Sequence, residues 1–279
     1  MQFILTTYRR LAIPMKSQHF LRLLTELTSY KWSSRLIGSF TKTKTSRLLI
    51  PWYSKTYAIC NEEAEKPVSA YRSLNDFFTR RLKSGLRPVD PYTASLVSPV
   101  DATVTEIGRI HDNLSIRVKG QEYKVGELLG RSIIPGNFNG GFFIILYLSP
   151  ADYHRIHSPV SGFIRETAHI PGKAYPVNEF GLKHMRKVLK RNERLITYMQ
   201  HRYGILSIVK VGAMNVCSIK YTEPLSLRLN KGDEFAYFEF GSTIILLMEN
   251  EPFEFRSGLG LGSRVRVGEP LGYWVAQMN

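Results

Sequence analysis

The sequence predicts an α+β fold with a mainly antiparallel or mixed β core and N-terminal helices. Beyond Pro88, short segments rich in β-branched and aromatic residues recur between Gly, Asn, Asp or Pro, which is the pattern of strands. A single helical segment, near residues 179–190, interrupts them. Strands with so few crossover helices argue against a doubly wound parallel sheet. Residues 1–60, in contrast, show helical periodicity.

Residues 1–66 are predicted to form a basic, amphipathic, helical N-terminal region that faces a membrane. Residues 1–60 hold ten Lys or Arg but one acid, Glu26. Four apolar residues repeat at i, i+3, i+4 and i+7 and so share one helix face: Phe20, Leu23, Leu24 and Leu27. Such a face either packs on the main domain or lies in a membrane interface, and the sequence leaves both open.

Residues 67–279 are predicted to form a β-rich catalytic domain. A helix is expected at 73–81, with Ser73 as N-cap and Asp76 three residues on. The glycine-rich run at 258–262 is expected to be a turn, because the 17 residues after it are too few for a dinucleotide-binding unit. The strand candidates are 103–107, 115–118, 142–148, 205–211, 217–221, 236–238 and 243–248.

Composition limits the possible partners and compartments. The net charge of +15 favours an anionic partner. RNA-binding signatures are absent, which disfavours nucleic acid. Cys60 and Cys217 give no disulfide framework, which fits a reducing cytosol. No apolar run approaches the roughly 18 residues that span a bilayer, and the N-terminal order of apolar and basic residues does not fit a secretory signal. We therefore expect a chain that lies on a membrane without crossing it.

The run Phe240-Gly241-Ser242-Thr243 precedes an apolar segment. A Gly–Ser peptide bond in such a place can rearrange: the Ser hydroxyl attacks the Gly carbonyl, the amide becomes an ester, and elimination breaks the chain. Ser242 would then become a pyruvoyl group. Taken alone, however, this run is more typical of a turn.

Several further motifs occur in order before this run. They are Ser73-Leu74-Asn75-Asp76-Phe77-Phe78-Thr79-Arg80-Arg81, Ser98-Pro99-Val100-Asp101, Asp152-Tyr153-His154-Arg155-Ile156-His157-Ser158-Pro159, Asn192-Glu193-Arg194 and Val211-Gly212-Ala213-Met214-Asn215-Val216. Over about residues 73–272 the chain closely resembles the phosphatidylserine decarboxylases, which are self-cleaving, pyruvoyl-dependent enzymes. Two positions depart from the family pattern: Phe240 replaces a more frequent Leu, and Ala102 replaces a frequent Gly. A positive φ at position 102 would strain an alanine.

The resemblance implies cleavage between Gly241 and Ser242, into a β chain (1–241) and an α chain (242–279), with a covalent pyruvate cofactor derived from Ser242. It assigns Asp101, His157 and Ser242 to activation of the nucleophile. A serine hydroxyl needs a nearby base, and a carboxylate orients a histidine that acts as one.

His154 is the candidate acid for turnover, or the residue that orients the substrate carboxylate, and the sequence does not separate its role from that of His157. A backbone N–H of Gly212 or Ala213 is a candidate oxyanion donor. We predict no metal site, because Asp152, His154 and His157 lack a further His or Cys at zinc-ligand spacing.

The implied activity is decarboxylation of phosphatidylserine to phosphatidylethanolamine and CO₂, in phospholipid biosynthesis. The expected partners are phosphatidylserine in anionic membranes, the two chains of one precursor, and further αβ units in a homo-oligomer; the expected location is peripheral, on the cytoplasmic face of the cell membrane. Three alternatives remain: a pyruvoyl enzyme for a soluble amino acid, a basic binding protein that never cleaves, and a serine hydrolase. No Gly-x-Ser-x-Gly elbow supports the last.

Overall fold

The computed structural model describes residues 38–130, 136–213, 218–239 and 242–275. The predicted helical face around Leu23 and the residue Gly241 lie outside these ranges. The helices are η1 (Lys44–Leu49), α4 (Ile50–Tyr57), η2 (Asn61–Glu63), η3 (Val68–Ala70), α5 (Leu74–Phe78), α6 (Val125–Leu129), α7 (Glu179–His184) and α8 (Val188–Arg191). The strands are β1 (Ser95–Val97), β2 (Ala102–Arg109), β3 (Ser115–Val118), β4 (Gln121–Lys124), β5 (Phe142–Leu148), β6 (Arg155–His157), β7 (Gly162–Ile170), β8 (Arg194–His201), β9 (Gly204–Gly212), β10 (Ser218–Tyr221), β11 (Arg228–Leu229), β12 (Glu234–Glu239), β13 (Ser242–Met248), β14 (Phe253–Phe255), β15 (Arg264–Val265) and β16 (Pro270–Trp274).

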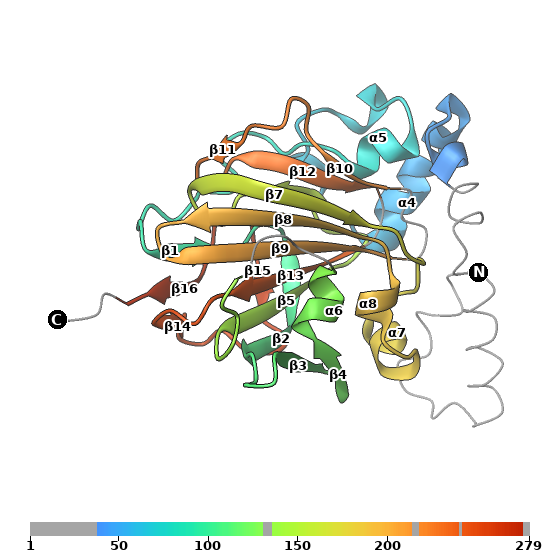
Figure 1. Cartoon of the computed structure of the whole chain (residues 1–279). Helices are drawn as coiled ribbons and strands as arrows, with labels where there is room; N and C mark the ends of the chain where they lie inside the picture. Colours follow the sequence, from blue (N-terminus) through green and yellow to red (C-terminus); the bar gives the residue numbers. More distant parts are fainter. Residues whose placement is uncertain (1–37, 131–135, 214–217, 240–241, 276–279) are drawn as a thin grey trace.

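An eight-stranded sheet of order β11-β7-β8-β9-β13-β5-β2-β15 forms the centre of the molecule (Figure 1). All its neighbouring strands pair antiparallel. Two three-stranded sheets, β1-β16-β14 and β10-β12-β6, contribute to the core on one face, and α6–α8 with the β3–β4 hairpin contribute to the core on the other. The predicted α+β class with an antiparallel core is confirmed.

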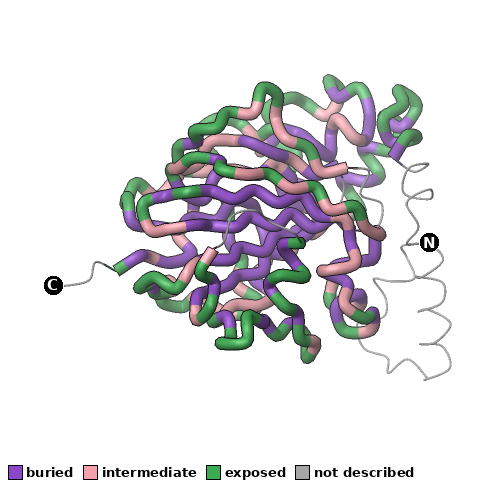
Figure 2. Tube along the Cα trace, in the orientation of Figure 1, coloured by how far each residue is buried: buried purple, intermediate pink, exposed green. Residues whose placement is uncertain are grey.

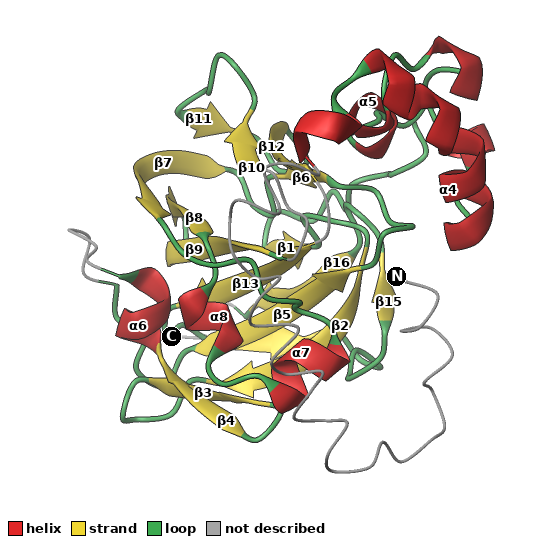
Figure 3. Ribbon diagram, turned by 90° about the vertical axis from the view of Figure 1, so that its right-hand side faces the viewer, coloured by secondary structure: helices red, strands yellow, loops and turns green. Residues whose placement is uncertain are grey.

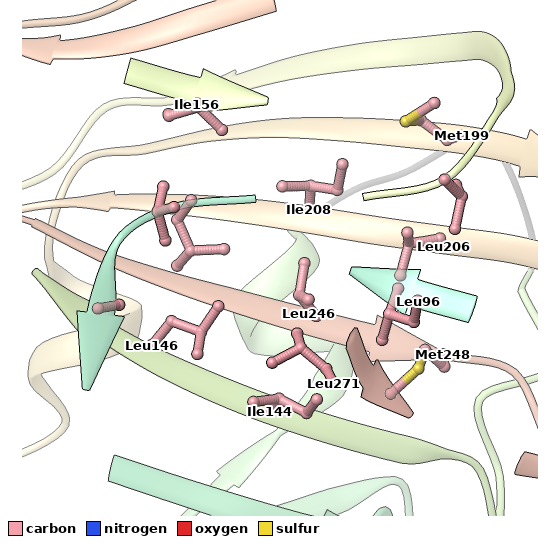
Figure 4. Close-up of a cluster of buried hydrophobic side chains, with 14 of the residues drawn as sticks. Leu96, Ile144, Leu146, Ile156, Met199, Leu206, Ile208, Leu246, Met248 and Leu271 are labelled. Atoms are coloured by element: carbon pink, nitrogen blue, oxygen red, sulfur yellow. The ribbon is translucent and has the colours of Figure 1, made fainter. Parts of the chain in front are cut away.

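The strand β13 lies between β9 and β5 and is buried along its whole length (Figure 2). Because side chains alternate across a strand, its two faces contribute to different cores. Ile244, Leu246 and Met248 pack with β5, β9 and the smaller sheets (Figure 4). Ile245 and Leu247 pack on the opposite face, toward the helices.

The N-terminal helices form a packed unit, which we call the N-terminal module (the described residues 38–81, with helices η1 to α5). Its core joins Ile50 and Tyr53 of α4 to Phe77 and Phe78 of α5, across the predicted boundary at 66/67. Figure 3 shows this module at one end of the β-sheets, beside β6 and β12. Among the described helices, none has the length and apolar character needed to cross a membrane.

The short helix predicted at 73–81 is present as α5, and Ser73 caps it by accepting the Asp76 N–H at 3.1 Å. The helix predicted near 179–190 is instead two helices, because Lys187 takes a left-handed conformation (φ 54°) between them. Ala102 has no positive φ and begins β2, so the departure from Gly causes no strain. The 258–262 run connects β14 to β15 without a helix, as predicted.

Candidate active site

Ser242 is the first residue of β13 and is fully buried. It lies opposite Leu148 of β5 and Gly212 of β9. By strand alternation its side chain shares the face of Ile244, which is the face covered by β6 and β12. Its Oγ has no hydrogen-bond partner among the described residues. A buried hydroxyl without a partner is costly, which marks Ser242 as a functional candidate.

The Asn192-Glu193-Arg194 motif holds the end of β9 against Ser242. The Gly212 N–H donates to the Glu193 carbonyl at 2.9 Å, and the Asn192 side-chain amide donates to the Gly212 carbonyl at 2.8 Å. Both backbone groups of Gly212 are therefore engaged. Of the two predicted oxyanion donors, Ala213 is the one that this arrangement leaves available.

His154 lies immediately before β6 and is fully buried. Its backbone carbonyl accepts the N–H of Phe238 at 3.0 Å, which places it beside the end of β12 that leads to Ser242. Its Nδ1 lies 2.8 Å from the Asp152 carbonyl oxygen; since a carbonyl only accepts, Nδ1 carries the proton. Nε2 is buried without a partner among the described residues. Burial lowers the pKa of His154 to about 3, so its ring is neutral near pH 7.

His157 ends β6, opposite Glu234 at the start of β12 and therefore away from Ser242. Its Nδ1–H donates to the Gly232 carbonyl at 2.7 Å, and its Nε2 accepts the Tyr153 hydroxyl at 3.1 Å. Both ring nitrogens are thus engaged. Burial lowers the pKa of His157 as well.

Asp101 lies just before β2 and is bound by Arg87. The Arg87 Nε lies 3.0 Å from both carboxylate oxygens and its Nη2 lies 2.6 Å from Oδ2. The Val267 N–H also donates to Oδ1 at 2.9 Å. The His157 N–H donates to the Pro99 carbonyl at 2.9 Å, so the two segments adjoin.

Within the described residues, no hydrogen bond links the side chains of Asp101, His157 and Ser242. The chain brings Asp101 and His157 to neighbouring segments, and it brings His154 to the end of β12 nearest Ser242. The Ser242 Oγ and the His154 Nε2 lie on the same side of the large sheet, and neither has a hydrogen-bond partner in the described part of the chain.

A polar cavity of about 530 Å³, whose wall includes Asp101, Asp152 and Tyr153, lies between the N-terminal module and the β-sheets. Its wall includes four acids and four arginines: Glu63, Asp101, Asp152, Glu269, Arg80, Arg87, Arg264 and Arg266. Arg264 pairs with Asp152 at 2.5 Å, and Arg87 pairs with Asp101, so much of the lining charge is compensated. No group of three His, Cys, Asp or Glu in the described part of the chain could hold a metal ion.

Two buried ionisable residues near Ser242 were not predicted from the sequence. Lys210 of β9 is opposite Ile244 on the face of Ser242, donates to Thr197 at 2.6 Å, and has a pKa that burial lowers well below its usual value. Glu239 ends β12, three residues before Ser242, and is 3% exposed. The position of Lys210 within the otherwise apolar 205–211 run could have indicated a buried lysine. No feature of the sequence indicated that Glu239 is buried.

Comparison with known proteins agrees with these motifs. A family model for phosphatidylserine decarboxylase matches residues 74–273. The phosphatidylserine decarboxylase proenzyme of Geobacillus sp. (strain WCH70) is 46% identical over 252 residues, which cover 90% of this chain and 97% of that protein. That of Geobacillus kaustophilus (strain HTA426) is 46% identical over 253 residues, covering 91% and 96%. That of Brevibacillus brevis (strain 47 / JCM 6285 / NBRC 100599) is 41% identical over 257 residues, covering 85% and 92%. The chain therefore belongs to the phosphatidylserine decarboxylase family and is an enzyme of this type.

Proposed function

We propose that this chain is a precursor that cleaves itself between Gly241 and Ser242 and then decarboxylates phosphatidylserine to phosphatidylethanolamine and CO₂ in phospholipid biosynthesis. One observation carries the proposal. Among the residues that the structure describes, the buried Ser242 hydroxyl at the start of β13 has no hydrogen-bond partner, and on the same side of the sheet neither has the unprotonated Nε2 of His154.

The cleavage chemistry uses groups of this chain and water. The Ser242 Oγ loses its proton to a base and attacks the Gly241 carbonyl carbon, and the peptide nitrogen leaves to give an ester. Loss of the Ser242 Cα proton then expels the Gly241 carboxylate and leaves a dehydroalanine. Water replaces its nitrogen, which departs as ammonia, and a pyruvoyl group remains at position 242. The Ala213 N–H is our candidate donor to the oxyanion.

The site fits such a group, because Ser242 begins a strand that is held on both sides. Residues 242–248 of the α chain pair with β5 and β9 of the β chain, so the cleaved chains stay together. When formed, the pyruvoyl group supplies an electron sink for the bond that loses CO₂. His154 serves as the proton carrier of turnover, since Nε2 is its free nitrogen and its neutral ring takes up a proton before it donates one.

We retain Asp101 and His157 as residues required for cleavage. His157 binds Tyr153 and Gly232, and Asp101 binds Arg87 and Val267, while the His157 N–H donates to the Pro99 carbonyl, so the two residues lie on adjoining, fixed segments. Loss of either should remove the base that activates Ser242 or change its orientation.

We also propose that the enzyme acts as a peripheral protein on the cytoplasmic face of the cell membrane. The described part of the N-terminal module exposes Leu48 (82%), Trp52 (55%) and Phe40 (48%) beside Lys44 and Arg47. An apolar surface next to cations suits an anionic lipid interface. Assembly of αβ units into a homo-oligomer stays a prediction.

Intact mass spectrometry under denaturing conditions tests the cleavage. We expect fragments of 241 and 38 residues (279 − 241 = 38) from the wild type and one uncleaved, inactive chain from Ser242→Ala. Ser207→Ala is the matched control, because Ser207 is also fully buried with an unpartnered Oγ, on the adjacent strand β9. It should cleave normally. Decarboxylation by a single full-length species would refute the pyruvoyl proposal.

A further inference from the structure

The motif at residues 73–81 has no role in the chemistry described so far. In the structure it places a buried cation, Arg80, which is 5% exposed. Its Nη2 donates to the carbonyls of Ala151, at 3.1 Å, and Asp152, at 3.4 Å, while Nε and Nη1 lack a hydrogen-bond partner among the described residues. Burying a guanidinium with few hydrogen-bond partners costs free energy, so we expect Arg80 to have a function that offsets this cost.

The Asp152 carbonyl connects Arg80 to His154. This oxygen accepts from the Arg80 Nη2 and also from the His154 Nδ1–H, at 2.8 Å. The second bond decides which ring nitrogen of His154 carries the proton, and so which one is free. The guanidinium therefore fixes the atom that sets the tautomer of His154.

The turn that carries this carbonyl is also fixed from its other side. The Asp152 carboxylate accepts from the Ser149 N–H at 2.7 Å and from the Ser149 hydroxyl at 2.8 Å. Arg264 binds the remaining carboxylate oxygen at 2.5 Å. The Asp152 side chain thus anchors the turn, whereas Arg80 holds the peptide carbonyl.

The two phenylalanines before Arg80 complete the arrangement. The guanidinium lies over the Phe77 ring, 5.3 Å from its centroid. The Phe78 ring packs on the His154 ring with centroids 4.0 Å apart. One short segment of the N-terminal module therefore holds both the plane of the imidazole and the carbonyl that binds it.

We propose that Arg80 is a positioning residue for His154: by binding the Asp152 carbonyl, it keeps the His154 proton on Nδ1 and leaves Nε2 as the nitrogen free for proton transfer. The inference rests on the proposed function for the role of His154 in turnover. Arg80 acts through this carbonyl, since nothing in the proposed chemistry places it at the reacting atoms. Its charge also adds to the effect of burial in lowering the pKa of His154.

The tautomer is measured directly in the uncleaved Ser242→Ala precursor, by two-bond ¹⁵N–¹H NMR of the imidazoles at pH 7. His154→Gln assigns the signal. We expect the Nδ1–H form with Arg80 present and a mixture of Nδ1–H and Nε2–H forms in Arg80→Met. Arg72→Met is the control, because Arg72 lies in the same module with an 87% exposed side chain, and it should leave the spectrum unchanged.

A folded Arg80→Met precursor with a pure Nδ1–H form overturns the proposal. If that variant does not fold, Arg80→Lys decides: its ammonium lacks the planar reach of the guanidinium, so a mixed tautomer supports the proposal and a pure Nδ1–H form refutes it. Because the precursor carries no pyruvoyl group, this result stands even if the cleavage proposal fails.

Turnover gives a second readout in the cleaved enzyme. Impaired proton transfer by His154 should lower kcat about tenfold or more in Arg80→Met, with KM little changed, and Arg80→Lys should not restore kcat fully, because its ammonium lacks the planar reach of the guanidinium. A change confined to KM would place Arg80 in substrate binding and overturn the positioning role.

Discussion

At the scale of single residues, the two histidines of the Asp152–Pro159 segment have different surroundings. Within the described ranges, one ring nitrogen of His154 is hydrogen-bonded and the other has no partner, whereas both ring nitrogens of His157 are hydrogen-bonded. A nitrogen that carries no proton can take part in proton transfer, whereas a ring with both nitrogens hydrogen-bonded holds neighbouring segments in place. Substitutions of the two residues should therefore impair different steps.

We predict that the His154→Ala precursor still cleaves but that its rate of decarboxylation falls about 100-fold or more. This is the usual contribution of a general acid–base group to a rate. His157→Ala and Asp101→Asn should instead slow cleavage. Denaturing gels measure the fraction of chains that are cleaved. CO₂ release, expressed per cleaved chain, measures turnover. Equal loss of cleavage in all three variants would contradict the division of roles.

Some site residues could be recognised from the sequence and others could not. Ser242, Asp101 and the two histidines stand in runs whose order matches a known family, and Ser73 was recognisable as a cap from local chemistry. The shared carbonyl of Arg80 and His154 joins residues more than seventy positions apart. Such a contact depends on how the N-terminal module packs, which no local pattern records.

At the scale of elements, the end of β12 is fastened by a buried carboxylate. Glu239 accepts from Lys42 at 2.8 Å and from Ser218, and it lies 3.6 Å from Lys220. Burial alone would raise the pKa of Glu239, but the bonds from Lys42 and Ser218 outweigh it and lower the pKa. The carboxylate thus ties Lys42 and β10 to the end of β12, the strand that precedes Ser242.

We predict that Glu239→Gln lowers the free energy of unfolding by about 1–3 kcal/mol, the cost of losing charged hydrogen bonds at a buried site. It should also slow cleavage, because β12 positions the residues before Ser242. Glu122→Gln is the control: that side chain is 50% exposed, and solvent screens its pair with Lys124, so the free energy of unfolding should barely change. Urea unfolding in the Ser242→Ala background measures the first effect. Equal values for the two variants would show that Glu239 does not fasten β12.

The strands differ in how well the sequence predicts them. The 142–148 prediction coincides with β5, and the 243–248 prediction misses one residue of β13, since both are apolar runs bounded by turn residues. The strand β8 was missed because its sequence mixes Arg194, Thr197 and His201 with apolar residues. Those three are buried by neighbouring strands and loops, so their burial is a tertiary effect.

At the scale of the whole molecule, the apolar and basic surface of the N-terminal module adjoins the cavity lined by Asp101 and Asp152. Ala58 and Cys60 follow α4 and line this cavity, while Leu48 and Trp52, in η1 and α4, are exposed. The surface proposed to contact a membrane therefore lies on the same side of the molecule as this cavity.

We predict that Leu48→Glu plus Trp52→Glu lowers co-sedimentation with phosphatidylserine-containing liposomes. Leu227→Glu plus Phe163→Glu is the control: it adds the same charge at residues 66% and 53% exposed, outside the module. Cations near an anionic bilayer contribute about 1 kcal/mol each, and salt screens them within about 8 Å, so wild-type binding should fall as salt rises. It should not vanish, because apolar insertion resists screening. Equal losses in the two variants would attribute the effect to added charge alone, and undiminished binding in the first would place the membrane contact elsewhere.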